Sequence, residues 1–262
     1  MMQAGAFPGP GFDAVIFDMD GVVTQTALVH AAAWKRLFDE YLRDRAARTG
    51  VPFVPFDAEA DYRPYIDAMP RYDGVRRFLA SRGISLPEGT PADPPAAETV
   101  CGLGNRKNGF FLAVVARHGV LPFPTTVALV RSLRERGLGT AIISASENAT
   151  DVLSAAGVLG LFDVQVDGTD AARLGLTGKP DPAIFLEAAR RLGVPPGRAV
   201  VVEDALAGVE AGRRGGFGLV VGVDRAGLRA ELAARGADVV VSDLGELPTA
   251  PVSGGDRESG PR

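Results

Sequence analysis

Cysteine is almost absent from the 262-residue sequence, which contains only Cys101. One cysteine excludes a disulfide within the chain and a zinc site built from several cysteines. The sequence gives Cys101 no evident catalytic base, so we expect an inert thiol in the core. This composition suits a reducing compartment, and we expect the protein in the cytoplasm.

Long apolar runs and clustered positive charge are also missing. No run of about 18 apolar residues occurs, so no membrane span is expected, and residues 1–12 lack the features of a signal peptide. The chain has 28 Lys and Arg against 32 Asp and Glu, a net charge of −4. This balance argues against a nucleic-acid or membrane partner. An anionic substrate would be bound by a few local cations and backbone dipoles.

What the sequence does contain is an alternation of short apolar runs and helical segments. The apolar runs are Ala14–Phe17, Leu138–Ile143, Ala199–Val202, Gly218–Val223 and Asp238–Val241. Continuous apolar runs are typical of strands covered by helices on both faces, which predicts a Rossmann-like parallel α/β core. In such sheets the carboxyl ends of the strands meet at one edge, where the ligand binds. We assign residues 13–26 and 120–249 to this core.

The alternation stops between residues 27 and 119, where no good strand is found. The helices expected there are Leu28–Leu42, Gly74–Ser81 and Thr99–His118. Such an insertion after the first strand should lie over the catalytic edge as a helical cap, with hinges at its ends. Residues 1–12 and 250–262 are rich in Gly, Pro and Ser and are expected to be flexible tails.

Two carboxylates follow the first predicted strand, in the segment FDMDGVVT (17–24). Asp18 and Asp20 are close enough in sequence to share one divalent cation. A carboxylate attacks a phosphate dianion poorly because both are negative, and Mg²⁺ between them offsets the repulsion. Gly21 allows a tight turn beside the phosphate. On its own, this segment is equally compatible with a solvated turn.

Three further segments carry polar side chains at comparable places. Ser144 ends an apolar run and precedes backbone N–H groups that could bind a phosphate. Lys179 comes just before a predicted helix, whose N-cap would be Asp181, and could neutralise a phosphate oxygen. Glu203 and Asp204 are costly to bury without a cation. Each segment has an ordinary alternative, such as a surface lysine or a helix cap, but together they supply different parts of one site.

These segments resemble the haloacid dehalogenase superfamily of phosphohydrolases and phosphomutases, and in particular its β-phosphoglucomutase-like family with long caps. The matching sequences are FDMDGVVT, AIISAS (141–146), GKPDP (178–182) and VVEDALAG (201–208). The resemblance implies that Asp18 is the phosphoryl-accepting nucleophile and Asp20 the general acid and base. It further implies a Mg²⁺ site formed by Asp18, the backbone carbonyl of Asp20, Glu203 and Asp204. The phosphate site that it implies is formed by Ser144, Ala145 and Lys179.

The predicted cap resembles that of the same mutases. His30 and Trp34 are four residues apart and share one helix face. The substrate-binding residues implied by the resemblance are Gly21, Thr26, His30, Trp34, Arg71, Lys107, Asn108 and Asn148. Without the resemblance, a histidine beside a tryptophan would be ordinary packing and each cation a solvated surface charge.

The sequence also departs from the family pattern. Gln25 replaces the usual Asp, and Asp67-Ala68 stand where shorter mutases carry Lys-Gly. The segment from Arg43 to Arg63 is longer than in those mutases. His118 matches no functional residue, and we expect it on the surface at a helix end.

The choice of reaction depends on the number of anion sites. A mutase holds two phosphates at once, and Arg71 with Lys107 would form the second site. The leading hypothesis is therefore interconversion of β-D-glucose 1-phosphate and glucose 6-phosphate through glucose 1,6-bisphosphate, by a monomer. The alternatives are a sugar-phosphate phosphatase, in which water attacks the phosphorylated Asp18, and a non-catalytic sugar-phosphate-binding protein.

Overall fold

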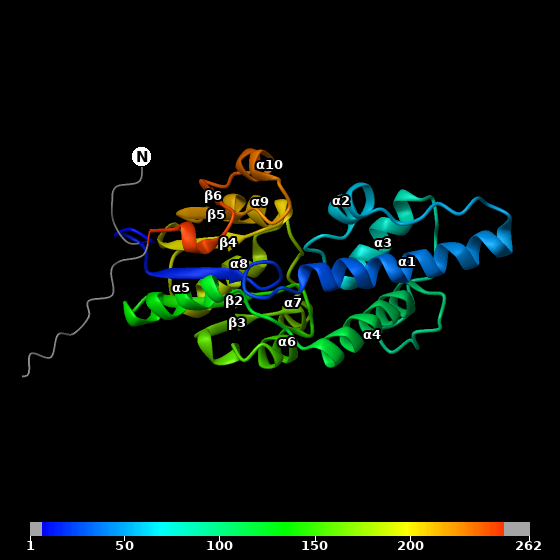
Figure 1. Cartoon of the computed structure of the whole chain (residues 1–262), viewed down its shortest axis with the longest axis horizontal. Coiled ribbons are helices and arrows are strands. Elements are labelled where there is room, and N and C mark those ends of the chain that lie inside the picture. The colour runs from blue at the N-terminus through cyan, green and yellow to red at the C-terminus, as the bar shows by residue number, and fades with distance from the viewer. Residues whose placement is uncertain (1–6, 249–262) are drawn as a thin grey trace, which may run out of the picture.

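The computed structural model describes residues 7–248, which form a sheet with covering helices and, beside it, a helical cap (Figure 1). The strands are β1 (Ala14–Asp18), β2 (Gly139–Ile143), β3 (Val164–Val166), β4 (Ala199–Glu203), β5 (Leu219–Val223) and β6 (Val239–Val241). They form one parallel sheet in the order β3-β2-β1-β4-β5-β6. β1 therefore lies inside the sheet, between β2 and β4.

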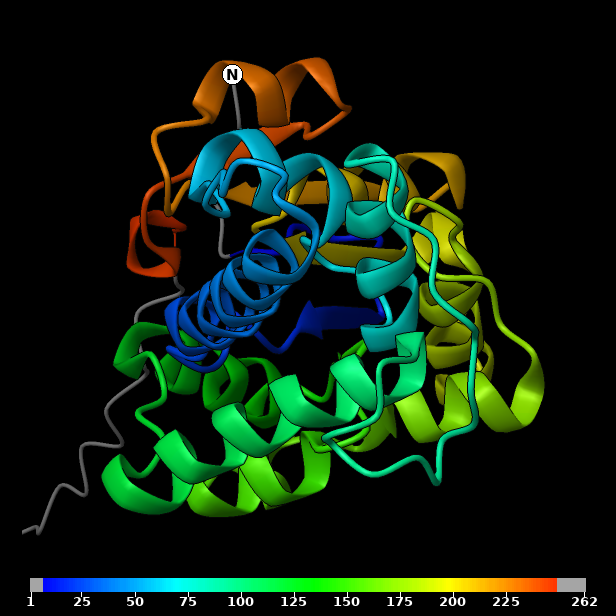
Figure 2. The ribbon, with the colours of Figure 1, turned by 90° about the vertical axis from the view of Figure 1, so that its right-hand side faces the viewer.

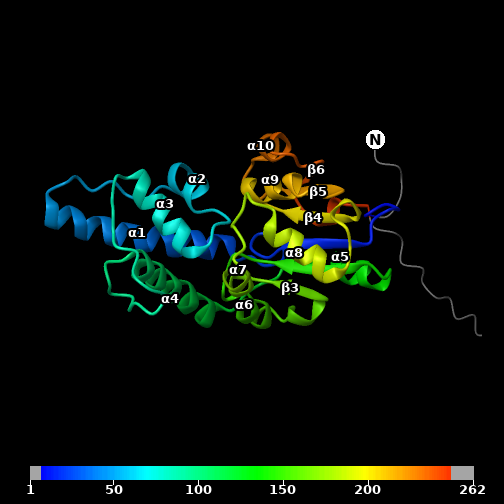
Figure 3. The ribbon, with the colours of Figure 1, turned by 180° about the vertical axis from the view of Figure 1, so that it is seen from behind.

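Successive strand residues face two separate apolar clusters, so both faces of the sheet need covering helices. Val15 and Phe17 pack with α5 (Pro124–Glu135) and α6 (Ala149–Ala155). Ala14 and Ile16 belong to the opposite cluster, to which α8 (Ala183–Leu192), α9 (Leu206–Arg214) and α10 (Arg229–Ala234) contribute. Figure 3 shows α8 in front of the sheet. The remaining short elements of this part are η2 (Leu159–Leu161), α7 (Gly168–Leu174), η3 (Pro196–Arg198) and η4 (Leu244–Glu246).

The inserted cap has its own apolar core. Its elements are α1 (Ala27–Thr49), η1 (Ala58–Tyr62), α2 (Arg63–Tyr65), α3 (Arg71–Ser81) and α4 (Val100–His118). Phe38 is central to this core: its ring lies 4.0 Å from that of Phe78 and 5.4 Å from that of Trp34, between centroids. Seen from the cap side, α1, α3 and α4 lie in front of the sheet (Figure 2). The predicted fold class, a parallel α/β core with an inserted helical cap, is confirmed.

Several local predictions need correction. The edge strand β3 was not expected, because a run of three residues with Gln165 at its centre gives little apolar signal. Helix α1 continues beyond Leu42 to Thr49, where Gly50 ends it in a left-handed conformation. The N-cap of α8 is Pro182 and not Asp181, because residues 178–181 form a turn. The Asp181 carboxylate still accepts the N–H of Ala183 at 2.9 Å.

Expectations at the ends of the chain and on single residues have mixed outcomes. Phe7 belongs to the segment predicted as a flexible tail, yet it is buried, and its carbonyl accepts a hydrogen bond from Arg136. Residues 1–6 and 249–262 lie outside the described residues, as does the predicted second tail. Cys101 is a buried free thiol and His118 is exposed at the end of α4, as expected. Within residues 7–248, no helix has the length and apolar character needed to cross a membrane.

Candidate active site

The carboxyl ends of two neighbouring strands bring three acidic side chains together. Asp18 ends β1, Glu203 ends β4, and Asp204 follows it directly. One carboxylate oxygen from each residue lies within 4.8 Å of the other two. Because β1 and β4 pair in parallel, with Phe17 opposite Val202, the backbone register itself places these acids side by side. An all-oxygen donor set of this kind fits a divalent metal ion.

Lys179 is buried in contact with this cluster. Its Nζ donates to Asp18 Oδ1 at 2.5 Å and to Glu203 Oε2 at 2.7 Å. Burial alone would lower the pKa of Lys179, but the two carboxylates outweigh it and raise that pKa. Burial, followed by the charge of Glu203, raises the pKa values of both Asp18 and Asp204. Negative charge thus remains in excess here, which favours binding of a further cation.

Two glycines make room for the acidic cluster. Gly21 has a φ of +81°, and a Cβ built there would lie 1.8 Å from Asp204 Oδ2. A Cβ at Gly208, in α9, would lie 2.1 Å from the carboxyl carbon of Glu203. Any other residue at position 21 would therefore strain the backbone and displace an acidic side chain.

The side chain of Asp20 turns toward the cap instead. Its Oδ1 accepts the hydroxyl of Thr26, and His30 Nε2 lies 3.5 Å from the same oxygen. Burial by itself would raise the pKa of Asp20, but His30 and the Thr26 hydrogen bond outweigh it and lower that pKa. The metal contact implied for Asp20 involves its backbone carbonyl and stays a prediction.

Lys107 extends this chain of contacts into the cap. Its Nζ lies 2.6 Å from His30 Nδ1 and 5.0 Å from the centre of the Trp34 ring. Burial lowers the pKa of Lys107 to about 7, with Asp20 opposing that change and Arg71 adding to it. Burial and Lys107 also lower the pKa of His30. The cap thus presents to Asp20 a buried pair of nitrogen bases with weakened positive charge.

The predicted phosphate loop follows β2. Ser144 is buried and its Oγ accepts the N–H of Ser146 at 3.0 Å. The loop packs tightly against the start of α7, since a Cβ at Gly168 would lie 2.7 Å from the carbonyl oxygen of Ala145.

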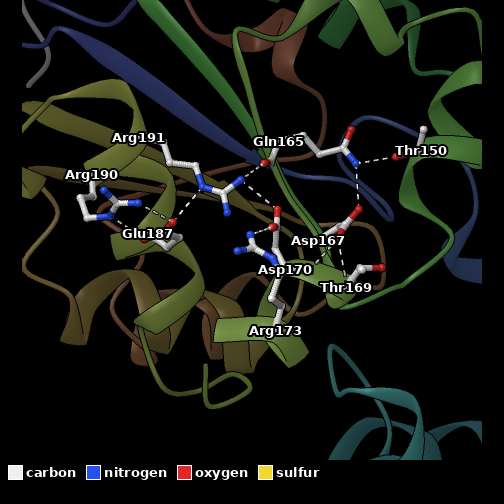
Figure 4. Close-up of polar contacts among 9 residues, drawn as sticks. All are labelled: Thr150, Gln165, Asp167, Thr169, Asp170, Arg173, Glu187, Arg190 and Arg191. Atoms are coloured by element: carbon white, nitrogen blue, oxygen red, sulfur yellow. Dashed lines mark hydrogen bonds and ion pairs between the residues drawn. The ribbon is translucent and has the colours of Figure 1, made fainter. Parts of the chain in front are cut away.

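Ion pairs on the core surface hold α7 in place (Figure 4). Asp167 accepts the N–H groups of Thr169 and Asp170 as the N-cap of the helix. Arg191, from α8, donates to Asp170 and to the backbone carbonyl of Gln165, both at 2.8 Å. This network fixes α7, whose first residue, Gly168, packs against the phosphate loop.

A cavity of about 500 Å³ lies between the cap and the carboxyl edge of the sheet. The predicted site residues that line it are Asp18, Asp20, His30, Trp34, Arg71, Lys107, Asn108, Ala145, Lys179, Glu203 and Asp204. The others are outside its lining, namely Gly21, Thr26, Ser144 and Asn148. Thr26 and Asn148 still contact lining residues. The hydroxyl of Thr26 donates to Asp20 Oδ1, and Asn148 Nδ2 donates to Asn108 Oδ1 at 2.6 Å.

Further residues line this cavity, and the sequence alone did not indicate a role for them. Tyr62, Asp67 and Glu147 line it. Burial and the charge of Glu203 raise the pKa of Asp67 to about 6. Glu147 Oε2 accepts a hydrogen bond from Arg71 Nη2 at 2.7 Å, joining core and cap. The position of Glu147 directly after the predicted phosphate loop was the sequence feature that could have indicated its place in the cavity.

Comparison with known proteins agrees with this geometry. A family model for haloacid dehalogenase-like hydrolases matches residues 12–216. A β-phosphoglucomutase of Mycobacterium tuberculosis is 49% identical over 237 residues, covering 89% of this chain and 90% of that protein. The crystal structure of a β-phosphoglucomutase from Clostridium difficile superposes with a TM-score of 0.70 at 25% identity, covering 90% of this chain and 93% of that one. A trehalose-phosphate phosphatase of Mycobacterium leprae is 45% identical over 130 residues, covering 48% of this chain and 28% of that protein.

The chain therefore belongs to the haloacid dehalogenase-like hydrolase family. Within this family its similarity to β-phosphoglucomutases identifies it as a phosphoryl-transfer enzyme. The similar proteins include relatives named as a β-phosphoglucomutase and relatives named as a trehalose-phosphate phosphatase, so the names of the relatives cover both a mutase and a phosphatase.

Proposed function

We propose that the protein is a Mg²⁺-dependent phosphomutase that interconverts β-D-glucose 1-phosphate and glucose 6-phosphate through an aspartyl-phosphate and glucose 1,6-bisphosphate. The observation that carries this proposal is the presence of cations at both ends of one cavity. Lys179 lies beside Asp18 on the core side, and Arg71 and Lys107 line the cap side. A sugar with a phosphate at each end needs positive charge at both ends of the cavity.

Asp18 would act as the nucleophile. Its carboxylate oxygen attacks the phosphorus of the substrate as the bond from phosphorus to the sugar oxygen breaks, and Lys179 neutralises charge beside it. A Mg²⁺ ion held by Asp18, Glu203 and Asp204 would supply the charge that offsets repulsion between carboxylate and phosphate. Ser144 and the backbone after it would orient the transferred group.

Asp20 would move the proton of the sugar oxygen. Its lowered pKa keeps it ionised in the free enzyme, ready to accept the proton of an attacking hydroxyl. A bound sugar would displace water from this carboxylate and so favour its protonated form, which acts as the acid in the opposite transfer. Thr26 and His30 hold the carboxylate in place for both roles.

We further propose that residues 13–26 and 120–249 act as the core domain and residues 27–119 as a closing cap. The connecting segments meet where the N–H of Gln25 donates to the carbonyl of Leu121 at 2.9 Å. Closure about this point would exclude water from the aspartyl-phosphate. We also propose that the protein acts as a monomer, in which the core and the cap of the same chain form the two walls of the cavity.

The decisive assay supplies β-D-glucose 1-phosphate, Mg²⁺ and a trace of the bisphosphate, and follows glucose 6-phosphate and free phosphate together. A mutase forms glucose 6-phosphate without equivalent phosphate release. Arg71→Ala should reduce isomerisation by about 100-fold, because the second phosphate loses its arginine. Arg77→Ala, which removes an exposed arginine from the same helix, is the matched control. Release of glucose and phosphate in equal amounts by the native enzyme would refute the mutase assignment.

One observation favours the phosphatase alternative. Arg71 already has an acidic partner in Glu147, so the second anion site carries less positive charge than the arginine alone would provide. In a phosphatase, water attacks the aspartyl-phosphate and no second phosphate has to be bound.

A further inference from the structure

The ion pair between Arg71 and Glu147 joins the two sides of the cavity. Arg71 is the first residue of α3 in the cap, and Glu147 lies in the core between β2 and α6. Their side chains are 17% and 46% exposed, respectively, and both residues line the cavity. The contact therefore occupies a group that the proposed reaction assigns to the second phosphate.

We propose that Glu147 is a specificity-determining residue that competes with the second phosphate of the ligand for Arg71. The inference rests on the proposed two-anion cavity and adds to it how the affinity of the cap-side site is set. A ligand with a phosphate on the cap side must displace the carboxylate, whereas an uncharged sugar end leaves the ion pair intact.

The surroundings of Arg71 leave it able to change partners. Its Nη2 contacts Glu147 at 2.7 Å and the hydroxyl of Tyr72 at 3.2 Å. Its Nε is buried and has no hydrogen-bond partner among residues 7–248. A guanidinium group binds phosphate best through two parallel N–H groups, and this unused donor could supply the second of them.

Glu147 is the more easily displaced of the two side chains. Its side chain is nearly half exposed, whereas that of Arg71 is mostly covered, so the carboxylate can turn into solvent more readily than the guanidinium group. Exposed ion pairs of this kind are individually weak. A phosphate dianion bound by two N–H groups therefore replaces the carboxylate, but with lower affinity than at an unpaired arginine.

Other charges near this end of the cavity do little to compensate. Lys107 is engaged with His30, and its pKa of about 7 leaves it only partly charged at neutral pH. Arg76 is paired with Asp73 and Glu88. The positive charge offered to a second phosphate thus depends chiefly on whether Arg71 is paired with Glu147.

The experiment measures the affinity for glucose 1,6-bisphosphate in the presence of Mg²⁺, in an Asp18→Asn background that prevents turnover. Trp34 is the single tryptophan and lines the cavity, so its fluorescence reports binding. Glu147→Gln should lower the dissociation constant about threefold, which corresponds to about 0.65 kcal/mol. Glu135→Gln removes the same charge from an exposed position at the end of α5 and should leave the constant unchanged.

A double-mutant cycle isolates the competition. In an Arg71→Ala background, Glu147→Gln should have no effect, because the contested group is gone. The inference is overturned if Glu147→Gln leaves the affinity unchanged or weakens it, or if its gain persists without Arg71. Since the cycle needs no turnover, it fails independently of the proposed function. An enzyme that only hydrolyses its substrate but shows the cycle would refute the mutase and retain the role of Glu147.

Discussion

The core and the cap position their functional side chains by different means. In the core, Asp18 and Glu203 end neighbouring parallel strands, so backbone pairing places them together. In the cap, the corresponding groups come from α1, α3 and α4, which a cluster of aromatic rings holds in place.

Their polar contacts also differ, since three side-chain pairs join the cap to the core. The pairs are His30 with Asp20, Arg71 with Glu147, and Asn108 with Asn148. The comparison teaches that the core can assemble the acidic site by itself, while under the proposed function the cap would select the ligand that completes it.

The largest expected effect tests whether the chemistry resides in the core. Asp18→Asn should reduce turnover by at least about 10³-fold, because an amide cannot accept the phosphoryl group. The melting temperature without metal should not fall, since the change removes a buried carboxylate that Glu203 repels. Both are measured on the purified variant by product formation and thermal unfolding. Substantial turnover in the folded variant would contradict the placement of the chemistry at Asp18 in the core.

A second substitution asks whether the core site depends on its close packing. Gly21→Ala would place a methyl group 1.8 Å from the carboxylate of Asp204, and displacement of a metal ligand by about 1 Å can cost about 100-fold in rate. Gly137→Ala introduces the same backbone strain, at φ +77°, where a Cβ meets no heavy atom within 4 Å among residues 7–248. We expect both variants to lose some stability and only the first to lose activity and metal affinity. Equal loss of activity in the two would show that strain, not the clash, is responsible.

The last effect is on stability and concerns a lysine of the cap. Lys107 has a pKa of about 7 when folded, against about 10.4 for a free lysine. Between these values the unfolded chain binds a proton that the folded protein lacks, so this lysine makes the free energy of unfolding rise with pH, by at most about 1.4 kcal/mol per unit. Lys107→Met should lack this rise in urea unfolding between pH 7 and 10. Lys35→Met is the control for loss of a lysine elsewhere in the cap, and an unchanged slope in Lys107→Met would contradict the assignment.

Much of the core could be predicted from the sequence because strands buried on both faces are written as continuous apolar runs. Five of the strands were anticipated, and the acids after β1 and β4 followed from their places in the chain. Strand β3 lacks this signal because it has only three residues, with Gln165 at its centre. The fold was therefore clearest where burial is greatest.

The cap was predicted less completely. The sequence predicts α1, α3 and α4, although it ends α1 at Leu42. It does not indicate α2, which has only three residues, or η1, because a π-helix has no distinct apolar period. The partner of Arg71 could not be identified, since Glu147 is 76 residues away and only the orientation of the cap brings it near. Contacts between the core and the cap depend on how the two are placed, so the sequence of either one does not indicate them.

The two connections of the cap lie side by side. The N–H of Gln25 donates to the carbonyl of Leu121, and the N–H of Phe123 donates to that of Val23, both at 2.9 Å. If residues 27–119 were deleted, a turn of a few residues could rejoin the chain without disturbing any strand. Insertions of quite different size can therefore be exchanged at this point during evolution. Such an exchange would alter the cap side of the cavity while the acids at the ends of β1 and β4 keep their positions.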